Sequence, residues 1–259
     1  MTGTWTEKIS RHRFLFEELV KRDFKKKYKR TVLGVLWSVL APLLNVLVLM
    51  LVFVNFFGKS QEHFIIYIFC GTMVMSFYTE TTQGCMRALM ANAAIFTKIN
   101  VPKVLFLLSK AFQSFINFLL TFAVFLAFCA GDGIRFGWHF LTMAYPIVWL
   151  LVMSLGVGMI LSALFVFFRD VEYLYSIFLT LLGYVSAVFY PVTMLPERWH
   201  FLFYTNPVYV YIAYFRAVTI DGAVPPWWLH LLCAVYALTF LGLGCVIYKK
   251  CNHEFLYYV

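Results

Sequence analysis

The stretch LGVLWSVLAPLLNVLVLMLVFVNFF, which runs from Leu33 to Phe57, contains no charged side chain. It is longer than the about 20 apolar residues that a helix needs to cross the hydrocarbon core of a bilayer. The whole chain of 259 residues is 63% hydrophobic and only 13% charged, with a mean hydropathy of +0.81. A soluble protein of this length could not bury so much apolar surface, so the sequence predicts an all-α integral membrane protein.

Five further apolar segments are long enough to be spans, which gives six in total. They are Phe64–Leu89, Val104–Ala130, Phe140–Phe168, Tyr173–Tyr190 and Trp227–Tyr248. A seventh apolar region, Phe201–Ala217, is short and is interrupted by Asn206 and Pro207, which favours a re-entrant or interfacial hairpin over a span. We therefore expect one transmembrane domain, 1–259, made of a basic interfacial arm (1–32), spans one to five (33–190), the hairpin region (191–226), span six (227–248) and a tail (249–259).

The distribution of lysine and arginine predicts the orientation. With six spans and the N-terminus inside, ten of these residues precede Thr31 and seven more lie at the inner ends of spans. Cytoplasmic loops carry an excess of Lys and Arg, so both termini are expected in the cytoplasm. Only four basic residues fall outside, and these are Lys59, Arg135, Arg198 and Arg216.

The basic arm has a helical repeat of its own. Phe16, Val20, Phe24 and Tyr28 recur every four residues, and lysines and arginines occupy the other positions. This pattern predicts an amphipathic helix that lies on the anionic inner leaflet. The alternative is a simple positive-inside anchor, and nucleic-acid binding is disfavoured because the charge adjoins a span directly.

The spans lack the groups that catalysis in a membrane would need. Glu80 is the only acidic residue inside an apolar segment, and no lysine, arginine or histidine lies mid-span. The six cysteines form no CxxC pair, so neither a metal site nor a disulfide framework is expected. No GxxxxGK[ST] sequence occurs, so we expect no enzyme activity and no cofactor in this chain; any ATP and magnesium would bind to another subunit.

Polar residues form stripes on the predicted spans in place of charge. Polar faces in lipid must contact other helices or water, and both readings, helix packing and a hydrophilic pathway, remain open. The stripes are Thr72, Ser76, Thr79, Glu80 and Gln83 in the second span, Tyr173, Ser176, Thr180 and Tyr184 in the fifth, and Gly34, Ser38 and Asn45 in the first. In the fourth span, Ser154, Gly158 and Ser162 have small-xxx-small spacing, which favours packing.

The loop after the second span contains a short predicted helix that starts near Asn92 and ends before Pro102. We expect Ile95 and Phe96 to face water there, which favours a protein partner. An ordinary surface turn is the alternative.

Three groups of motifs occur in order along nearly the whole chain. The first is the basic run from Arg22 into Leu33-Gly34-Val35-Leu36-Trp37, followed by Ala41-Pro42-Leu43, and the second is Phe168-Arg169-Asp170. The third comprises Tyr190-Pro191, Leu195-Pro196, Asn206-Pro207 and Tyr214-Phe215-Arg216. With these motifs in this order, the chain resembles the membrane subunit of type-2 ABC exporters. The resemblance is to the branch that moves polysaccharides such as O-antigen, teichoic acid and capsular glycans.

The resemblance implies a cytoplasmic coupling helix that contacts an ATPase subunit, and by position this helix includes Ile95, Phe96, Thr97 and Lys98. It also implies an external gate of two short re-entrant helices over Arg198–Val218, and the gate residues are Pro191, Asn206, Pro207 and Arg216. The stripe residues Thr72, Ser76, Thr79, Glu80, Tyr173, Ser176, Thr180 and Tyr184 become candidates for the substrate pathway.

The implied assembly is a homodimer of this chain with two copies of an ABC ATPase, which bind ATP and magnesium, in the bacterial cytoplasmic membrane. The substrate would be a lipid-linked glycan. The side chains of Lys25, Lys26, Lys27, Lys29 and Arg30 are expected to contact its phosphate groups or the inner leaflet. Alternatives are an exporter of a small drug or lipid with the same fold, and a membrane scaffold without transport activity.

Overall fold

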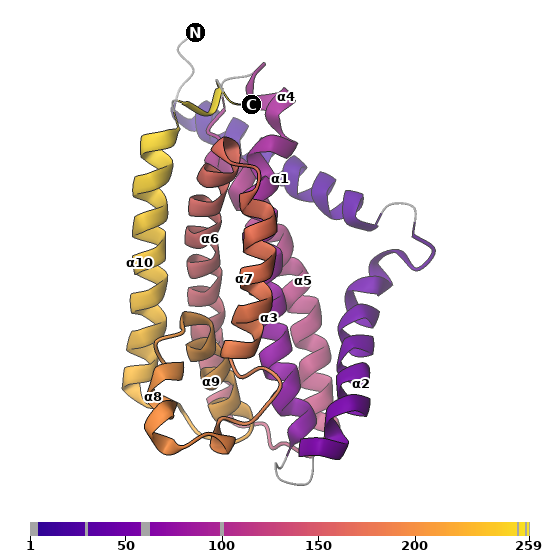
Figure 1. Cartoon of the computed structure of the whole chain (residues 1–259). Coiled ribbons are helices and arrows are strands. Elements are labelled where there is room, and N and C mark those ends of the chain that lie inside the picture. The colour runs from indigo at the N-terminus through magenta and orange to yellow at the C-terminus, as the bar shows by residue number, and fades with distance from the viewer. Residues whose placement is uncertain are drawn as a thin grey trace.

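The computed structural model describes residues 5–28, 31–57, 63–98, 101–252, 254–256 and 258. Within these ranges the chain is helical and contains no strand, as the sequence predicted. Long helices stand side by side as a bundle, and helix α1, Trp5–Tyr28, lies across one end of it (Figure 1). The two short helices α8, His200–Phe203, and α9, Pro207–Thr219, lie at the opposite end. We call these ends the basic end and the hairpin end.

Four helices of the described chain are long and apolar enough to cross a bilayer. They are α3 (Phe64–Ala91), α5 (Val104–Gly131), α6 (Ala144–Phe167, extended by the 3-10 turn Trp138–Met143) and α10 (Trp227–Cys251). The other two predicted spans correspond to α2, Trp37–Phe57, and α7, Val171–Val185, whose described apolar parts are shorter. Four of the six spans are therefore confirmed in length, and spanning by α2 and α7 stays a prediction.

Helix α7 ends five residues earlier than the predicted fifth span, which was wrong at this boundary. The chain turns at Ala187, whose φ of 48° is in the left-handed region. This conformation costs about 1–2 kcal/mol for a residue with a Cβ. The Ala187 carbonyl accepts a hydrogen bond of 3.0 Å from Nη2 of Arg216, a residue of α9, so a tertiary contact holds the turn.

Helix α6 packs closely against both α10 and α3. A Cβ at Gly156 would lie 2.5 Å from the backbone nitrogen of Leu241, and one at Gly244 would lie 2.5 Å from the Gly156 carbonyl oxygen. On another face of α6, a Cβ at Gly158 would lie 2.5 Å from Cβ of Cys85. Ser154 and Ser162 are fully buried, so the predicted packing role of the small residues in this span is confirmed.

The basic end contains α1, the 3-10 turns Gly34–Leu36 and Glu254–Leu256, and the short helix α4, Ala93–Phe96. The predicted amphipathic helix is present. Its apolar face packs partly on protein: Leu19 is buried, and the ring of Phe16 meets that of Phe112 in α5 edge to face at 5.7 Å between centroids. This face therefore contacts α5 of the bundle.

The segment between α7 and α10 forms a hairpin that enters the bundle and returns. It comprises the 3-10 turns Val192–Met194 and Glu197–Trp199, followed by α8 and α9. The Tyr204 carbonyl, between α8 and α9, accepts from the Tyr236 hydroxyl at 2.9 Å. Tyr236 lies nine residues beyond the start of α10 at Trp227, which places this contact about 13 Å into the bundle at 1.5 Å per residue. The segment before the last long helix thus contains two short helices where a hairpin was expected, and its re-entry into the membrane stays a prediction.

The contact between α6 and α10 predicts an asymmetric response to two alanine substitutions. Gly156→Ala forces the helices apart and should destabilise the protein by about 1–3 kcal/mol, as overpacking generally does. Gly242→Ala, in α10, meets nothing within 4 Å and should be neutral or slightly stabilising, because alanine favours a helix more than glycine does. Denaturant titration of both purified variants in mixed micelles measures the difference. Equal stability of the two variants would show that the helices do not meet at these residues.

Candidate functional site

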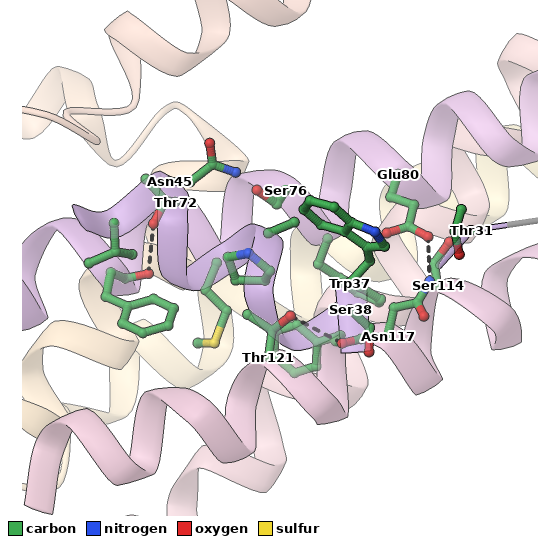
Figure 2. A pocket seen from close by; sticks show the side chains of 17 residues that line it. Thr31, Trp37, Ser38, Asn45, Thr72, Ser76, Glu80, Ser114, Asn117 and Thr121 are labelled. Atoms are coloured by element: carbon green, nitrogen blue, oxygen red, sulfur yellow. Dashed lines mark hydrogen bonds between the residues drawn. The ribbon is translucent and has the colours of Figure 1, made fainter. Parts of the chain in front are cut away.

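A cavity of about 490 Å³ lies between α2, α3 and α5 (Figure 2). Its lining combines hydroxyl, amide and carboxyl groups with aromatic rings, and we call it the groove. The polar residues are Thr31, Ser38, Asn45, Thr72, Ser76, Glu80, Ser114, Asn117 and Thr121. The apolar residues are Trp37, Ala41, Pro42, Val46, Phe69, Met73, Phe77 and Phe118.

Glu80 provides the acidic group of the groove. Its Oε1 accepts a hydrogen bond of 2.7 Å from Nδ2 of Asn117, which belongs to α5 (Figure 2). A carboxylate inside a membrane costs several kcal/mol unless a partner or water reaches it. The contact therefore requires that α3 and α5 present their polar faces to each other at this depth.

The hydroxyl groups of the groove keep acceptor sites for other ligands. The Thr72 hydroxyl donates to the Ile68 carbonyl at 2.9 Å, and the Thr121 hydroxyl donates to the Asn117 carbonyl at 3.1 Å. A hydroxyl that donates one hydrogen bond still has two acceptor lone pairs. Ser76 is exposed in the groove wall. Together with the indole of Trp37, which is 40% exposed, these groups suit a hydroxyl-rich or hydrated ligand.

The groove includes part of the predicted pathway. Thr72, Ser76 and Glu80 line it, whereas Thr79 and Gln83 do not. The fifth-span stripe, Tyr173, Ser176, Thr180 and Tyr184, lies on α7 away from the groove. All four of its residues are exposed on one face, as the spacing predicted. The groove also includes Ser38 and Asn45, from the stripe predicted on the first span.

Sequence reasoning missed the third wall of the groove. Ser114, Asn117 and Thr121 of α5 are polar positions three and four residues apart. This is the helical spacing that singled out the second-span stripe, so the signal was present in the sequence. It stood out less because α5 is otherwise strongly apolar.

A polar cluster at the basic end ties α1 to the bundle. Asp23, which is 4% exposed, pairs with Lys110 of α5 at 3.0 Å and with Arg22 at 2.8 Å. Nη2 of Arg22 also donates to Oδ1 of Asn92 at 2.7 Å. The short helix α4 starts directly after Asn92, as predicted, but the Asn92 side chain does not cap it, because its Nδ2 donates back to the Ala88 carbonyl at 2.7 Å. The cluster links the interfacial helix to the junction of α3 and α4.

The expectation that Phe96 faces water was wrong, because the side chain is only 5% exposed. Its ring packs 6.0 Å from that of Phe106, and the Lys103 ammonium lies over the rings of both Phe96 and Phe255. Nζ of Lys103 also donates to the Asn252 carbonyl at 2.6 Å, and burial lowers the pKa of Lys103. The tail after α10 therefore covers this side of α4.

The remaining coupling residues are more accessible than Phe96. Ile95 is half-buried in the same apolar cluster, and Thr97 and Lys98 are exposed. Thr97 and Lys98 directly follow the last residue of α4, and we call this polar surface the exposed edge of α4.

The predicted phosphate-contacting residues divide into three groups. Lys25 and Lys26 are exposed on α1, and no carboxylate pairs with either among the described side chains. Lys27 belongs to α1, but its side chain lies outside the described part, as do Lys29 and Arg30 entirely.

The four predicted gate residues all belong to the re-entrant region. Pro191 precedes its first turn, and Pro207 begins α9. Asn206 caps α9, because its Oδ1 accepts from the Val208 backbone at 3.0 Å, and its Nδ2 donates to Oγ of Ser186 at 2.8 Å. Arg216, which was counted among the outside basic residues, belongs to α9, and its side chain is 8% exposed, inside the bundle.

Known proteins similar to this chain transport polysaccharides. The sequence profile of the family described as ABC-2 type transporter matches residues 15–220. An O-antigen export system permease protein, RfbA, of Klebsiella pneumoniae is 27% identical over 93% of this chain and 95% of its own length. An RfbA of Myxococcus xanthus is 25% identical over 95% and 96%, and the polysialic acid transport protein KpsM of Escherichia coli is 20% identical over 90% and 92%.

The groove predicts a pattern of thiol labelling in a variant whose six native cysteines have been replaced. Ser76→Cys and Asn45→Cys should react with a small water-soluble thiol reagent, because the thiolate forms where water reaches it. Thr81→Cys, from a fully buried neighbour on α3, should stay unlabelled in the folded protein and react only after denaturation. Mass spectrometry of the labelled protein measures all three. An unreactive Ser76→Cys would mean that the groove is dry.

Proposed function

This chain belongs to the ABC-2 type transporter family, and on that premise we propose that it is the permease subunit of an ATP-driven polysaccharide exporter. The substrate is a lipid-linked polysaccharide of the O-antigen, teichoic acid or capsule type. The observation that carries the proposal is the near full-length similarity to RfbA, which covers 93% of this chain and 95% of the relative. The part of the relative that the match leaves out is too short to carry a separate activity.

The groove supports a glycan substrate through its chemistry. Sugar rings have apolar C–H faces that pack on aromatic rings, and hydroxyl groups that bond to amides, hydroxyls and carboxylates. Trp37 and Phe118 provide the first kind of surface, and Asn45, Ser76 and Glu80 provide the second. Each contact is weak by itself, so a polymer can move past the groove without being trapped.

The energy for transport comes from a partner in this proposal. The sequence contains no P-loop, so a separate ABC ATPase, in two copies, binds ATP and magnesium. Its docking surface is the exposed edge of α4, including Thr97 and Lys98. Movement there is passed on through Asn92 to Arg22 and Asp23, which join α4 to α1 and α5.

The charges of the bundle support an orientation with the basic end in the cytoplasm of a bacterium. Among the described side chains, Arg135, Arg198 and Arg216 are the basic residues of the hairpin end. The basic end holds Arg13, Lys21, Arg22, Lys25, Lys26, Arg87, Lys98, Lys103, Lys110, Arg169, Lys249 and Lys250. Exposed Lys25 and Lys26 then lie at the inner leaflet, where they attract its anionic lipids or the phosphates of the lipid-linked substrate.

Two permeases form a homodimer around the pathway in this proposal. The exposed face of α7 supports this, because it combines large apolar side chains with Tyr173 and Tyr184, which are 72% and 59% exposed. The outer face of α2 is likewise exposed at Leu47, Val48 and Leu51. Because these faces of α2 and α7 are exposed, they are available to a second copy.

Deletion of the gene tests the proposal. We expect the deletion strain to lose its surface polysaccharide and to accumulate the lipid-linked polymer inside the cell, and the wild-type gene to restore export. Surface polysaccharide is measured by immunoblotting of intact cells and the internal pool by mass spectrometry of extracted lipids. Normal surface polysaccharide in the deletion strain would refute the proposal.

Charge reversal at the exposed edge of α4 tests the docking surface. Lys98→Glu should reduce export and co-purification of the ATPase subunit by about tenfold, which corresponds to about 1.4 kcal/mol of lost interaction. Stability should change by no more than about 0.5 kcal/mol, because Lys98 is exposed. Lys250→Glu, an exposed basic residue at the end of α10, is the matched control and should affect neither. Unchanged co-purification of Lys98→Glu would place the docking surface elsewhere.

A further inference from the structure

A second cavity, of about 330 Å³, lies at the hairpin end, and we call it the hairpin pocket. It shares no lining residue with the groove. Its walls come from the start of α3, the re-entrant segment and the start of α10. The lining residues include Tyr67, Tyr204, Tyr209, Arg216, Asp221 and Trp228.

Four aromatic side chains, from α3, the turn between α8 and α9, α9 and α10, line the hairpin pocket. The ring of Tyr204 lies edge to face with Tyr209, at 5.3 Å between centroids, and with Trp228 of α10, at 5.0 Å. Tyr209 and Tyr67 are buried, whereas Trp228 at the rim is 38% exposed. Such rings present flat apolar faces to a ligand in the cavity.

Arg216 brings a buried cation to this pocket. Its Nη2 donates to the carbonyls of Tyr67, Ala187 and Val188 at 3.0–3.3 Å, and its guanidinium stacks 3.4 Å from the centre of the Tyr67 ring. Within the described residues the hydrogen bonds of Arg216 come from Nε and Nη2, and no carboxylate pairs with it there. Nη1 is not among the fully buried unpaired atoms of these residues, so an oxygen atom of a ligand in the pocket can accept a hydrogen bond from it.

Asp221 and Thr193 add acceptors on the exposed side of the pocket. Partial burial raises the pKa of the Asp221 carboxyl, and no lysine or arginine pairs with it in the described part of the chain. The pocket thus offers a donor at its base, acceptors at its rim and aromatic faces between them.

We propose that the hairpin pocket binds a single sugar residue of the polysaccharide after the polymer has crossed the bundle. The ring packs on the aromatic wall at Trp228 and Tyr204, an exocyclic oxygen accepts from Nη1 of Arg216, and sugar hydroxyls donate to Asp221. The cavity volume falls at the small end of the about 300–1,000 Å³ range of ligand sites. The inference rests on the proposed function for the source of the sugar and adds a binding site at the far end from the ATPase.

Binding of the lipid-free surface polysaccharide of the source organism tests the proposal. The polysaccharide is released by mild acid and titrated into the purified full-length chain in nanodiscs, with saturation-transfer NMR and calorimetry as readouts. We expect binding that Trp228→Ala weakens by about threefold to tenfold, because the sugar loses the aromatic face on which it packs. Trp227→Ala removes the neighbouring indole, which is 76% exposed and does not line the pocket, and should leave binding unchanged.

Asp221→Asn provides a second variant, since an exposed carboxyl can be changed without disturbing the packing of Tyr204 against Trp228. It should also weaken binding while the unfolding transition stays at its wild-type position. Absence of binding to the wild-type chain, or binding that neither Trp228→Ala nor Asp221→Asn alters, overturns the inference. These results are separate from the deletion test: a strain that loses export while its purified permease binds no sugar retains the proposed function and refutes only the pocket.

Discussion

The close approach of α6 to both α10 and α3 is the contact on which the rest of the bundle depends. Lipid tails are as apolar as leucine, so helices in a membrane associate through close packing rather than through the hydrophobic effect. Gly156 and Gly244 let two backbones touch, and Gly158 accepts Cys85 of α3 on another face. This packing occupies one face of α3 and leaves its other face, with Thr72, Ser76 and Glu80, to be covered by α2 and α5. The position of the groove therefore depends on which face of α3 packs against α6 at Gly158.

The buried positive charge of Arg216 holds the re-entrant hairpin, and backbone carbonyl groups stabilise that charge. Arg216 of α9 donates to the carbonyls of Ala187 and Val188, which follow the C-terminal end of α7, and to Tyr67 of α3. The C-terminus of a helix carries partial negative charge, and the Tyr67 ring adds a cation–π contact. A Cβ at Gly71 would lie 3.1 Å from Nη2 of Arg216, so a larger side chain there would displace the guanidinium. One side chain therefore joins the hairpin, α7 and α3.

Hydropathy predicted the features that depend on length and composition. The helices α3, α5, α6 and α10 and the amphipathic α1 lie where the sequence placed them. The errors have tertiary causes. The apolar run that begins at Tyr173 continues to Tyr190, but Arg216, far along the chain, holds a turn at Ala187. The sequence alone predicts that Phe96 is exposed on a short helix. In the structure the tail, with Phe255, covers the same side of α4. Spacing can reveal a polar stripe, but not which neighbouring helix will face it.

The polar stripes predicted on α3 and α7 differ physically, although they look alike in sequence. On α7 the Ser176 hydroxyl donates to the Tyr173 carbonyl at 2.8 Å and the Thr180 hydroxyl donates to the Ser176 carbonyl at 3.2 Å. Such hydroxyls satisfy their donors within their own helix, so this stripe tolerates lipid, water or another protein. Glu80 on α3 cannot be satisfied within its own helix in this way, because a carboxylate accepts hydrogen bonds and needs a donor or water. It finds Asn117 on a different helix. The side chains that need water or a polar partner inside the membrane therefore lie between α2, α3 and α5. The exposed stripe on α7 can contact lipid, water or another subunit, depending on how the protein assembles.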